Sequence, residues 1–213
     1  MTTKVLNLYA GIGGNRKLWE DVDVTAVEWD EEKADVYQDH FPEDTVVIED
    51  AHEYLRKNHE GYDFIWASPP CPTHSRMRRT NTDIESVYPD MRLYQEILLL
   101  EHDFDGDYAV ENVNPYYEPL IEPQIRGRHA FWSNYHIPVF SDKGGNDVTT
   151  HGQGGGQGRE GCYELAKKYG FELRQYDFTT EFLRKIVSNC VKPELGKHVF
   201  EAATKNRQTK LFE

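Results

Sequence analysis

The stretch Pro69-Pro70-Cys71-Pro72 carries the clearest chemical signal in the sequence. Prolines on both sides restrict the backbone and hold the Cys71 thiol on a rigid turn. Because a free thiol has a pKa of about 8.5 and is largely protonated at neutral pH, a nucleophilic role requires positive charge nearby. Arg76, Arg78 and Arg79 follow shortly after and could supply that charge or bind phosphates. We therefore interpret Cys71 as a candidate covalent nucleophile.

Two other interpretations of Cys71 stay open at this point. Its side chain could simply be a small buried apolar group, which is a common role for cysteine. Cys71 and His74 also have the spacing of half a zinc site, but no second pair with suitable spacing appears in the sequence. We therefore predict no metal site.

Three acidic residues share a position in the sequence pattern with Cys71. Glu28, Asp50, Cys71 and Glu111 each come just past a segment that is predicted to be a strand. These segments are Val22–Val27, Thr45–Ile48, Phe64–Ala67 and Tyr108–Val110. Because parallel strands end at one edge of a sheet, where ligands bind, we expect these side chains to form one composite site.

A glycine-rich turn, Gly11-Ile12-Gly13-Gly14, follows the first predicted strand, Lys4–Leu8. Glycines let the backbone approach a ligand and expose N–H groups, although this spacing differs from the dinucleotide fingerprint. Glu28 could accept hydrogen bonds from ribose hydroxyls, and Trp29 could stack on an adenine ring. Asp50 could accept from the adenine amino group. The alternatives are solvated loop acids and a core tryptophan.

The elements that would position these residues alternate between strands and helices. Helices are predicted from near Asn15 and over Glu31–His40, Met91–His102, Glu160–Tyr169, Phe182–Val187 and Pro193–Thr204. The alternation in the first half predicts an α/β fold, with a Rossmann-like, doubly wound, mostly parallel sheet. A further strand is expected within His129–Ile137, and the glycine-rich stretch Gly144–Gly161 is expected to form an irregular loop.

The chain has 213 residues and a formal net charge of -13. Its length fits one domain, or one domain with a small appendage. The acidic total predicts weak intrinsic affinity for DNA, or a host with high internal salt, unless a local basic face compensates. No apolar run is long enough to span a membrane, and the N-terminus has no signal-peptide pattern. With three cysteines that lack framework spacing, we expect a cytoplasmic protein.

Taken in order, the motifs resemble the cytosine-C5 DNA methyltransferase family. The segments that carry the resemblance are Leu8–Gly14, Glu28-Trp29, Asp50-Ala51, Ser68–Cys71, Glu111–Val113, Gln124–Arg128 and Ser188–Pro193. There are departures: Pro72-Thr73-His74-Ser75 follows the cysteine where the family usually has Gln, a small residue, Phe and Ser, and Ser188 replaces a glycine. The segment between Arg128 and Ser188 is also much shorter than the family's target-recognition domain. These departures bear on sequence specificity more than on chemistry.

The resemblance implies a class I methyltransferase fold that binds S-adenosylmethionine and methylates carbon 5 of a cytosine in DNA. The implied catalytic residues are Cys71, which attacks carbon 6, Glu111 at ring N3, and Arg126 and Arg128, which bind the ring carbonyl or brace Glu111. The implied cofactor-binding residues are Tyr9, Ala10, Gly11, Ile12, Gly13, Gly14, Glu28, Trp29, Asp50, Ala51, Pro70, Asn189 and Val191. Ser75, Arg76, Arg78 and Arg79 are candidates for a loop that binds nucleic acid around a flipped or unpaired base.

Three parts of the chain are expected on this basis: a catalytic and cofactor-binding core over 1–140, a reduced recognition region over 141–180, and a C-terminal segment over 181–213 that returns to the cofactor. Two alternatives stay open. The same chemistry could act on a tRNA-like RNA, or the chain could be a non-catalytic cofactor- or DNA-binding subunit whose protein partner supplies recognition.

Overall fold

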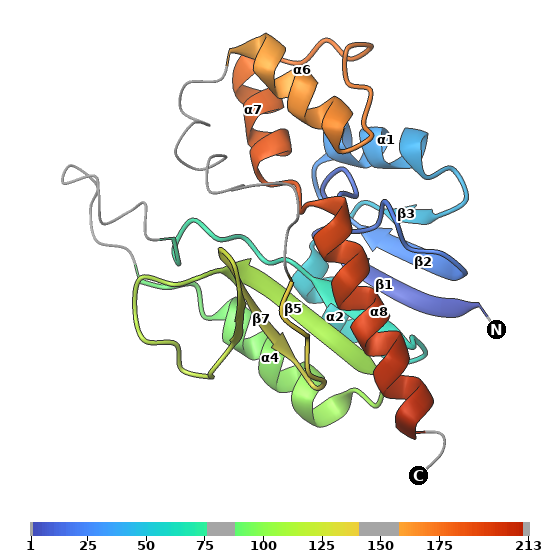
Figure 1. Cartoon of the computed structure of the whole chain (residues 1–213), viewed down its shortest axis with the longest axis vertical. Helices are drawn as coiled ribbons and strands as arrows, with labels where there is room; N and C mark the ends of the chain where they lie inside the picture. Colours follow the sequence, from blue (N-terminus) through green and yellow to red (C-terminus); the bar gives the residue numbers. More distant parts are fainter. Residues whose placement is uncertain (1, 76–87, 141–157, 211–213) are drawn as a thin grey trace.

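The computed structural model describes residues 2–75, 88–140 and 158–210, and within these ranges seven strands form one sheet (Figure 1). The strands are β1 Thr3–Leu8, β2 Val22–Val27, β3 Thr45–Val47, β4 Phe64–Ala67, β5 Asp107–Val113, β6 Gln124–Arg126 and β7 His129–Ser133. Their order across the sheet is β3-β2-β1-β4-β5-β7-β6. Strands β1 to β5 pair with one another in parallel, and β7 is antiparallel to both β5 and β6. The predicted doubly wound, mostly parallel sheet is confirmed.

The helices of the described ranges pack on both faces of this sheet. They are α1 Glu31–His40, α2 Ala51–Asn58, α4 Arg92–Asp103, α6 Arg159–Lys168, α7 Thr180–Ser188 and α8 Pro193–Lys210. Figure 1 shows α8 crossing one face, and α2 and α4 belong to the core of the opposite face. Central strands covered on both faces need continuous apolar runs, and all four residues of β4 are buried.

Each face of the sheet has its own apolar cluster. Leu55 of α2 and Ile97 of α4 join one of them, while Val199 and Phe200 of α8 join the other together with Trp19. A third cluster unites α1 with α6 and α7, which lie beside it in Figure 1. The late helices α6, α7 and α8 are therefore part of the same packed body as the sheet.

The segment after β1 differs from its prediction. A helix was expected from near Asn15, but residues 11–18 form turns instead. The backbone bonds there join residues three apart, with the Arg16 N–H donating to the Gly13 carbonyl at 3.1 Å and the Trp19 N–H to the Arg16 carbonyl at 3.0 Å, which is the pattern of turns and not of an α-helix. The buried Asn15 side chain donates to Asn7 of β1 at 2.7 Å, which ties this turn region to the sheet. The predicted helix is therefore wrong.

The other predicted elements are found with small shifts in their bounds. The strand expected within His129–Ile137 is β7, and the helix expected over Phe182–Val187 is α7, which begins earlier because Thr179 caps it through Phe182 N at 3.2 Å. Helix α2 and strand β6 were not predicted. Most of the glycine-rich stretch lies outside the described residues. Among the described helices, none combines the length and apolar character that crossing a membrane requires.

Candidate active site

The glycine turn after β1 packs tightly against two other parts of the chain. A Cβ on Gly13 would lie 2.3 Å from Cε2 of Phe41, just past the end of α1. A Cβ on Gly14 would lie 2.3 Å from the Val191 carbonyl oxygen and 2.3 Å from the Cys190 sulfur. Only a residue without a side chain allows these approaches. The turn is therefore in direct contact with the segment that joins α7 to α8.

Glu28 holds the glycine turn to the end of β2. The Gly11 N–H donates to its Oε2 at 2.9 Å, and the Asp30 N–H donates to its Oε1 at 3.1 Å. Lys33 adds an ion pair at 3.4 Å to the same oxygen. Because Glu28 is buried, these partners satisfy a carboxylate that would otherwise be costly to remove from water.

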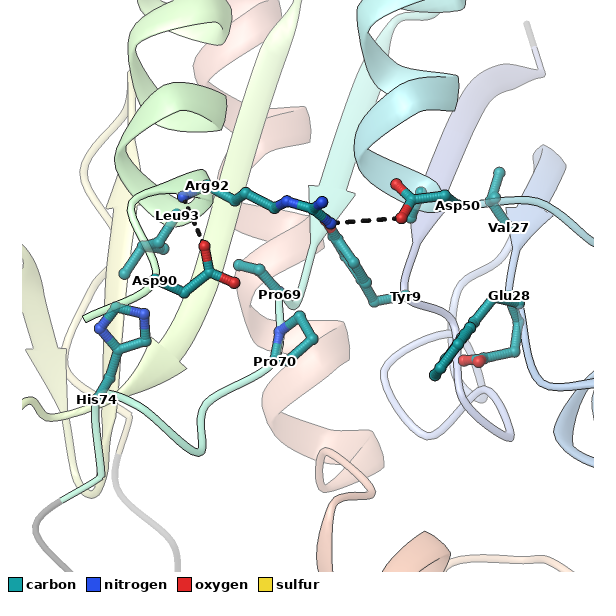
Figure 2. A pocket seen from close by; sticks show the side chains of 12 residues that line it. Tyr9, Val27, Glu28, Asp50, Pro69, Pro70, His74, Asp90, Arg92 and Leu93 are labelled. Carbon is teal, nitrogen blue, oxygen red and sulfur yellow. Dashed lines mark hydrogen bonds and ion pairs between the residues drawn. The ribbon is translucent and has the colours of Figure 1, made fainter. Parts of the chain in front are cut away.

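A pocket of about 260 Å³ opens at the carboxyl ends of β1, β2 and β4 (Figure 2). Its lining comprises Tyr9, Val27, Glu28, Trp29, Asp50, Ala51, Pro69, Pro70, His74, Asp90, Arg92 and Leu93. Six of the predicted cofactor-binding residues are thus brought to one cavity. Trp29 is 74% exposed, so its indole face is available to a ligand rather than buried in the core.

Asp50 has two roles at the pocket. It caps α2 by accepting from the Glu53 N–H at 3.0 Å, and its Oδ2 pairs with Arg92 Nη1 at 3.4 Å. Figure 2 shows the Arg92 side chain reaching across the pocket toward Asp50. Both side chains are more than half exposed, so the pair is worth little to stability. Its contribution is to place a cation and an anion at the same edge of the cavity.

A polar network of Tyr9, His52 and the buried Glu96 lies beside the pocket. The Tyr9 hydroxyl donates to Oε1 of Glu96 on α4, and His52 Nδ1 lies 2.9 Å from the same oxygen. Burial raises the pKa of Glu96 and is also the main cause that raises the pKa of Tyr9. The network fixes the Tyr9 ring, which lines the pocket.

Cys71 lies in the segment that leaves β4, immediately after the two prolines that line the pocket. The segment is fixed by the Asn112 side chain, which donates to the Pro69 carbonyl at 2.9 Å, and by the His74 N–H, which donates to the Cys71 carbonyl at 2.9 Å. The thiol is partly exposed. Burial and the negative charge of Glu111 raise its pKa, and Arg128 acts in the opposite direction.

Glu111 of β5 faces a histidine that was not predicted to be part of the site. His129 Nδ1 lies 2.6 Å from Glu111 Oε1, and Arg128 Nε donates to His129 Nε2 at 3.2 Å. Burial alone would raise the pKa of Glu111, but His129 lowers it, together with Ser68 and Arg128, and the net result is a pKa below the ordinary value. The expected proton donor is therefore held as a carboxylate.

Arg126 lies apart from this group. Its guanidinium donates to the Ile137 carbonyl at 2.8 Å, to the Pro138 carbonyl at 3.0 Å and to Gln124 Oε1 at 3.2 Å. These contacts hold the β6–β7 hairpin to the segment that follows it. The hypothesis that Arg126 braces Glu111 is wrong, because its donors are used on these carbonyls.

Several predicted residues do not line the pocket. Ala10 and Ile12 are buried in the cluster that includes α1, Val191 packs in the cluster around α8, and Asn189 caps the end of α7. Ser75 forms a bridge with Pro115. The predicted nucleic-acid-binding residues Arg76, Arg78 and Arg79 lie outside the described residues.

His74 is the pocket residue that departs from the family motif. It is buried, and its Nδ1 lies 2.6 Å from the Tyr117 hydroxyl. Burial lowers its pKa. The described residues contain no group of three or more His, Cys, Asp or Glu side chains that could hold a metal ion. His74 therefore contributes to packing and to the pocket wall.

Part of the chain matches a known protein family. Residues 3–92 match the family of C-5 cytosine-specific DNA methylases. The resemblance inferred from the motifs is confirmed over this part of the chain, which includes the glycine turn, the pocket acids and Cys71. The family implies S-adenosylmethionine as cofactor and a nucleic acid as the class of substrate. Among curated proteins, none matches the sequence significantly.

One solved structure has a similar fold over nearly the whole chain, and two others align with about half of it. The Entamoeba histolytica methyltransferase EhMeth is 14% identical, with 97% of this chain and 99% of that chain covered at a TM-score of 0.62. A SAM-dependent methyltransferase from Agrobacterium tumefaciens is 15% identical, with 55% and 40% covered at a TM-score of 0.39. A mutant of Spodoptera frugiperda DNMT2 is 25% identical, with 53% and 36% covered at a TM-score of 0.37. The likeness to EhMeth supports the predicted class I methyltransferase fold.

Proposed function

We propose that this methyltransferase transfers a methyl group from S-adenosylmethionine to carbon 5 of a cytosine in DNA, through a covalent bond between Cys71 and carbon 6. The observation that carries the proposal is the position of Cys71. It follows directly on Pro70 of the pocket, and its pKa responds to both Glu111 and Arg128. A thiol in that position is flanked by a cofactor pocket on one side and by groups suited to a pyrimidine ring on the other.

The pocket residues suit the adenosine part of the cofactor. Trp29 and Leu93 offer apolar surface for an adenine ring, Asp50 can accept from its amino group, and Glu28 can accept from ribose hydroxyls. When bound there, S-adenosylmethionine supplies an electrophilic methyl group. The close packing of Gly14 against Val191 would keep the turn and the C-terminal segment together beside it.

The residues around Cys71 can perform the remaining steps. The thiolate adds to carbon 6, and the electron pair of the ring double bond moves toward N3, where Glu111 can deliver a proton. Arg128 can bind the ring carbonyl as negative charge develops. After carbon 5 has gained the methyl group, a base removes its proton, the C5–C6 double bond re-forms as the bond to sulfur breaks, and the Cys71 thiolate leaves; the proton on N3 returns to Glu111. A base inside a duplex cannot reach these groups, so it must be flipped or unpaired.

Trapping of the covalent intermediate tests this proposal. An oligonucleotide with 5-fluorocytosine should form a stable adduct with the wild-type protein in the presence of S-adenosylmethionine, because fluorine cannot leave carbon 5 as a proton does. Cys71→Ala should form no adduct and still bind the cofactor. Cys162→Ala, which alters a buried thiol on α6, is the matched control and should form the adduct normally. A full yield of adduct from Cys71→Ala would refute the covalent route.

The choice of nucleic acid needs a separate experiment, since the net charge of -13 gives no general attraction to phosphate. Transfer of labelled methyl should be measured to duplex DNA, single-stranded DNA and tRNA of equal concentration at low salt. We expect label in a DNA arm. Label in tRNA alone would keep the chemistry and change the substrate. Cofactor binding without transfer to any arm would favour a subunit that requires a partner for recognition.

A further inference from the structure

Glu111 and His129 are brought together by the register of two antiparallel strands. Val113 pairs with His129, and Glu111 pairs with Phe131, so residues 111 and 129 are diagonal neighbours across β5 and β7. Their side chains are only 10% and 12% exposed, and Oε1 of Glu111 lies 2.6 Å from Nδ1 of His129. This is a short, charge-assisted contact between two nearly buried groups.

Arg128 determines which ring nitrogen of His129 carries the proton. Its Nε is always a donor, and it lies 3.2 Å from Nε2 of His129. Nε2 must therefore accept, which leaves the proton on Nδ1, where it points at Glu111. The three side chains form a directed chain of hydrogen bonds from Arg128 through His129 to one oxygen of Glu111.

We infer that His129 is a positioning residue for the proposed methyl transfer: it engages Oε1 of Glu111 and so orients the carboxyl group toward the ring nitrogen of the target cytosine. Two rotatable bonds separate the Glu111 carboxyl from its Cβ, and a fixed donor at one oxygen removes that freedom. This inference rests on the proposed function of Glu111. It adds a residue that stands directly after the Gln-x-Arg-x-Arg motif and outside it.

The arrangement has a consequence for the pH at which Glu111 takes up a proton. The groups that face it are His129 of β7, Arg128 of the β6–β7 turn, and Ser68 and Cys71 of the segment after β4. His129 gives the largest contribution that lowers the Glu111 pKa against the effect of burial. Without the donor at position 129, only Ser68 and Arg128 counteract the effect of burial, and both lower the pKa of Glu111 less than His129 does. The pKa of Glu111 should therefore rise.

The carboxyl titration of Glu111 can be followed by carbon-13 NMR in the protein without cofactor or DNA, and Glu111→Gln identifies the signal. In His129→Ala the midpoint should move to higher pH than in the wild type. His129→Asn is the matched control, because its amide nitrogen occupies the place of Nδ1 and can still donate. Its midpoint should stay closer to the wild type than that of His129→Ala. Equal midpoints in the wild type and His129→Ala would overturn the inference, and so would equal shifts in both variants.

A second measurement needs no substitution. Nitrogen-15 NMR of the wild type at neutral pH should show His129 protonated at Nδ1, and protonation at Nε2 instead would overturn the chain from Arg128. If the wild type transfers methyl groups, the acid limb of its pH–rate profile should also move to higher pH in His129→Ala and less in His129→Asn. Because both NMR readouts use the free protein, a failure of the methyl-transfer proposal would be seen separately, as a wild type that titrates as expected and forms no adduct.

Discussion

Gly14→Ala should separate the glycine turn from the C-terminal segment that packs on it. The added Cβ would lie 2.3 Å from the Val191 carbonyl oxygen and 2.3 Å from the Cys190 sulfur. Nonbonded atoms have their optimal separation at about 3.5 Å or more, so one of the two segments would have to move by roughly 1 Å. The sulfur could shift by side-chain rotation, but the carbonyl oxygen belongs to the backbone between α7 and α8.

The magnitude follows from the kind of atom that must move. Overpacking a well-filled site costs about 1–3 kcal/mol, and a contact with backbone places Gly14→Ala near the upper end of that range. For a chain of about this length each kcal/mol lowers the melting temperature by roughly 2–4 °C, which gives a decrease of about 6–12 °C. Because the same turn adjoins the pocket, S-adenosylmethionine should also bind more weakly.

Thermal unfolding followed by circular dichroism measures the first effect, and isothermal titration calorimetry measures the second. Gly158→Ala serves as the matched control, because a Cβ there meets no atom within 4 Å and the residue lies at the start of α6, in another part of the molecule. Because Gly158 is the N-cap of α6, where glycine is preferred to alanine, the free energy of unfolding of Gly158→Ala should fall by about 1 kcal/mol at most. If Gly14→Ala melted within about 2 °C of the wild type, the close packing deduced for this turn would be wrong.

Other perturbations test the electrostatics, the pocket and the core. Glu111→Gln removes a negative charge beside Cys71, so half-maximal alkylation by iodoacetamide should occur at lower pH than in the wild type, whereas Arg128→Gln should shift it to higher pH. Midpoints that do not move would show that these charges do not control the thiol. Trp29→Ala should weaken cofactor binding by roughly 10-fold if the indole stacks on adenine, and an unchanged affinity in calorimetry would contradict that role. Asp44→Ala leaves the partly buried Arg16 without its bidentate partner and the buried Tyr37 hydroxyl without its acceptor, so urea unfolding should show a loss of about 3 kcal/mol; a loss under about 1 kcal/mol would mean that the site relaxes.

Much of the fold could be predicted because buried parallel strands have a plain sequence pattern. Phe64–Ala67 is an apolar run and Val22–Val27 is rich in β-branched residues, each has a polar residue directly after it, and both are found as strands with those bounds. Helix α2 was missed because it is short and mostly polar, with only Ala51 and Leu55 buried. Its start was nevertheless marked by Asp50, which serves as its N-cap. From the sequence, Asp50 was interpreted as a cofactor ligand or a solvated loop acid, and its role as a cap was not predicted.

Only some of the pocket residues could be predicted from the sequence. Glu28, Asp50 and Pro70 could be found because each follows a strand end or a motif, and the sheet brings those positions together. Leu93 and Arg92 enter the pocket from the start of α4, and no local pattern reports which helix residues overhang a strand end. The predicted role of Arg126 in the active site was wrong for a related reason. Its motif is intact, but the hairpin turns its side chain toward the segment after β7.

The pKa values of the two groups on which the chemistry depends, Cys71 and Glu111, are shifted in opposite directions. Burial and the negative charge of Glu111 raise the pKa of Cys71, while His129 holds the pKa of Glu111 low. The free protein therefore rests with a thiol and a carboxylate, whereas addition to carbon 6 and proton delivery to N3 require a thiolate and a carboxylic acid. These two states have the same net charge and differ by the position of one proton. The reactive form is then a minor population over the whole pH range between the two pKa values, so the rate should show a broad plateau there, with the acid limb set by Glu111 and the alkaline limb by Cys71. A variant that raises the pKa of Glu111 should raise the height of that plateau as well as move its acid edge, provided that the orientation of the carboxyl group is kept.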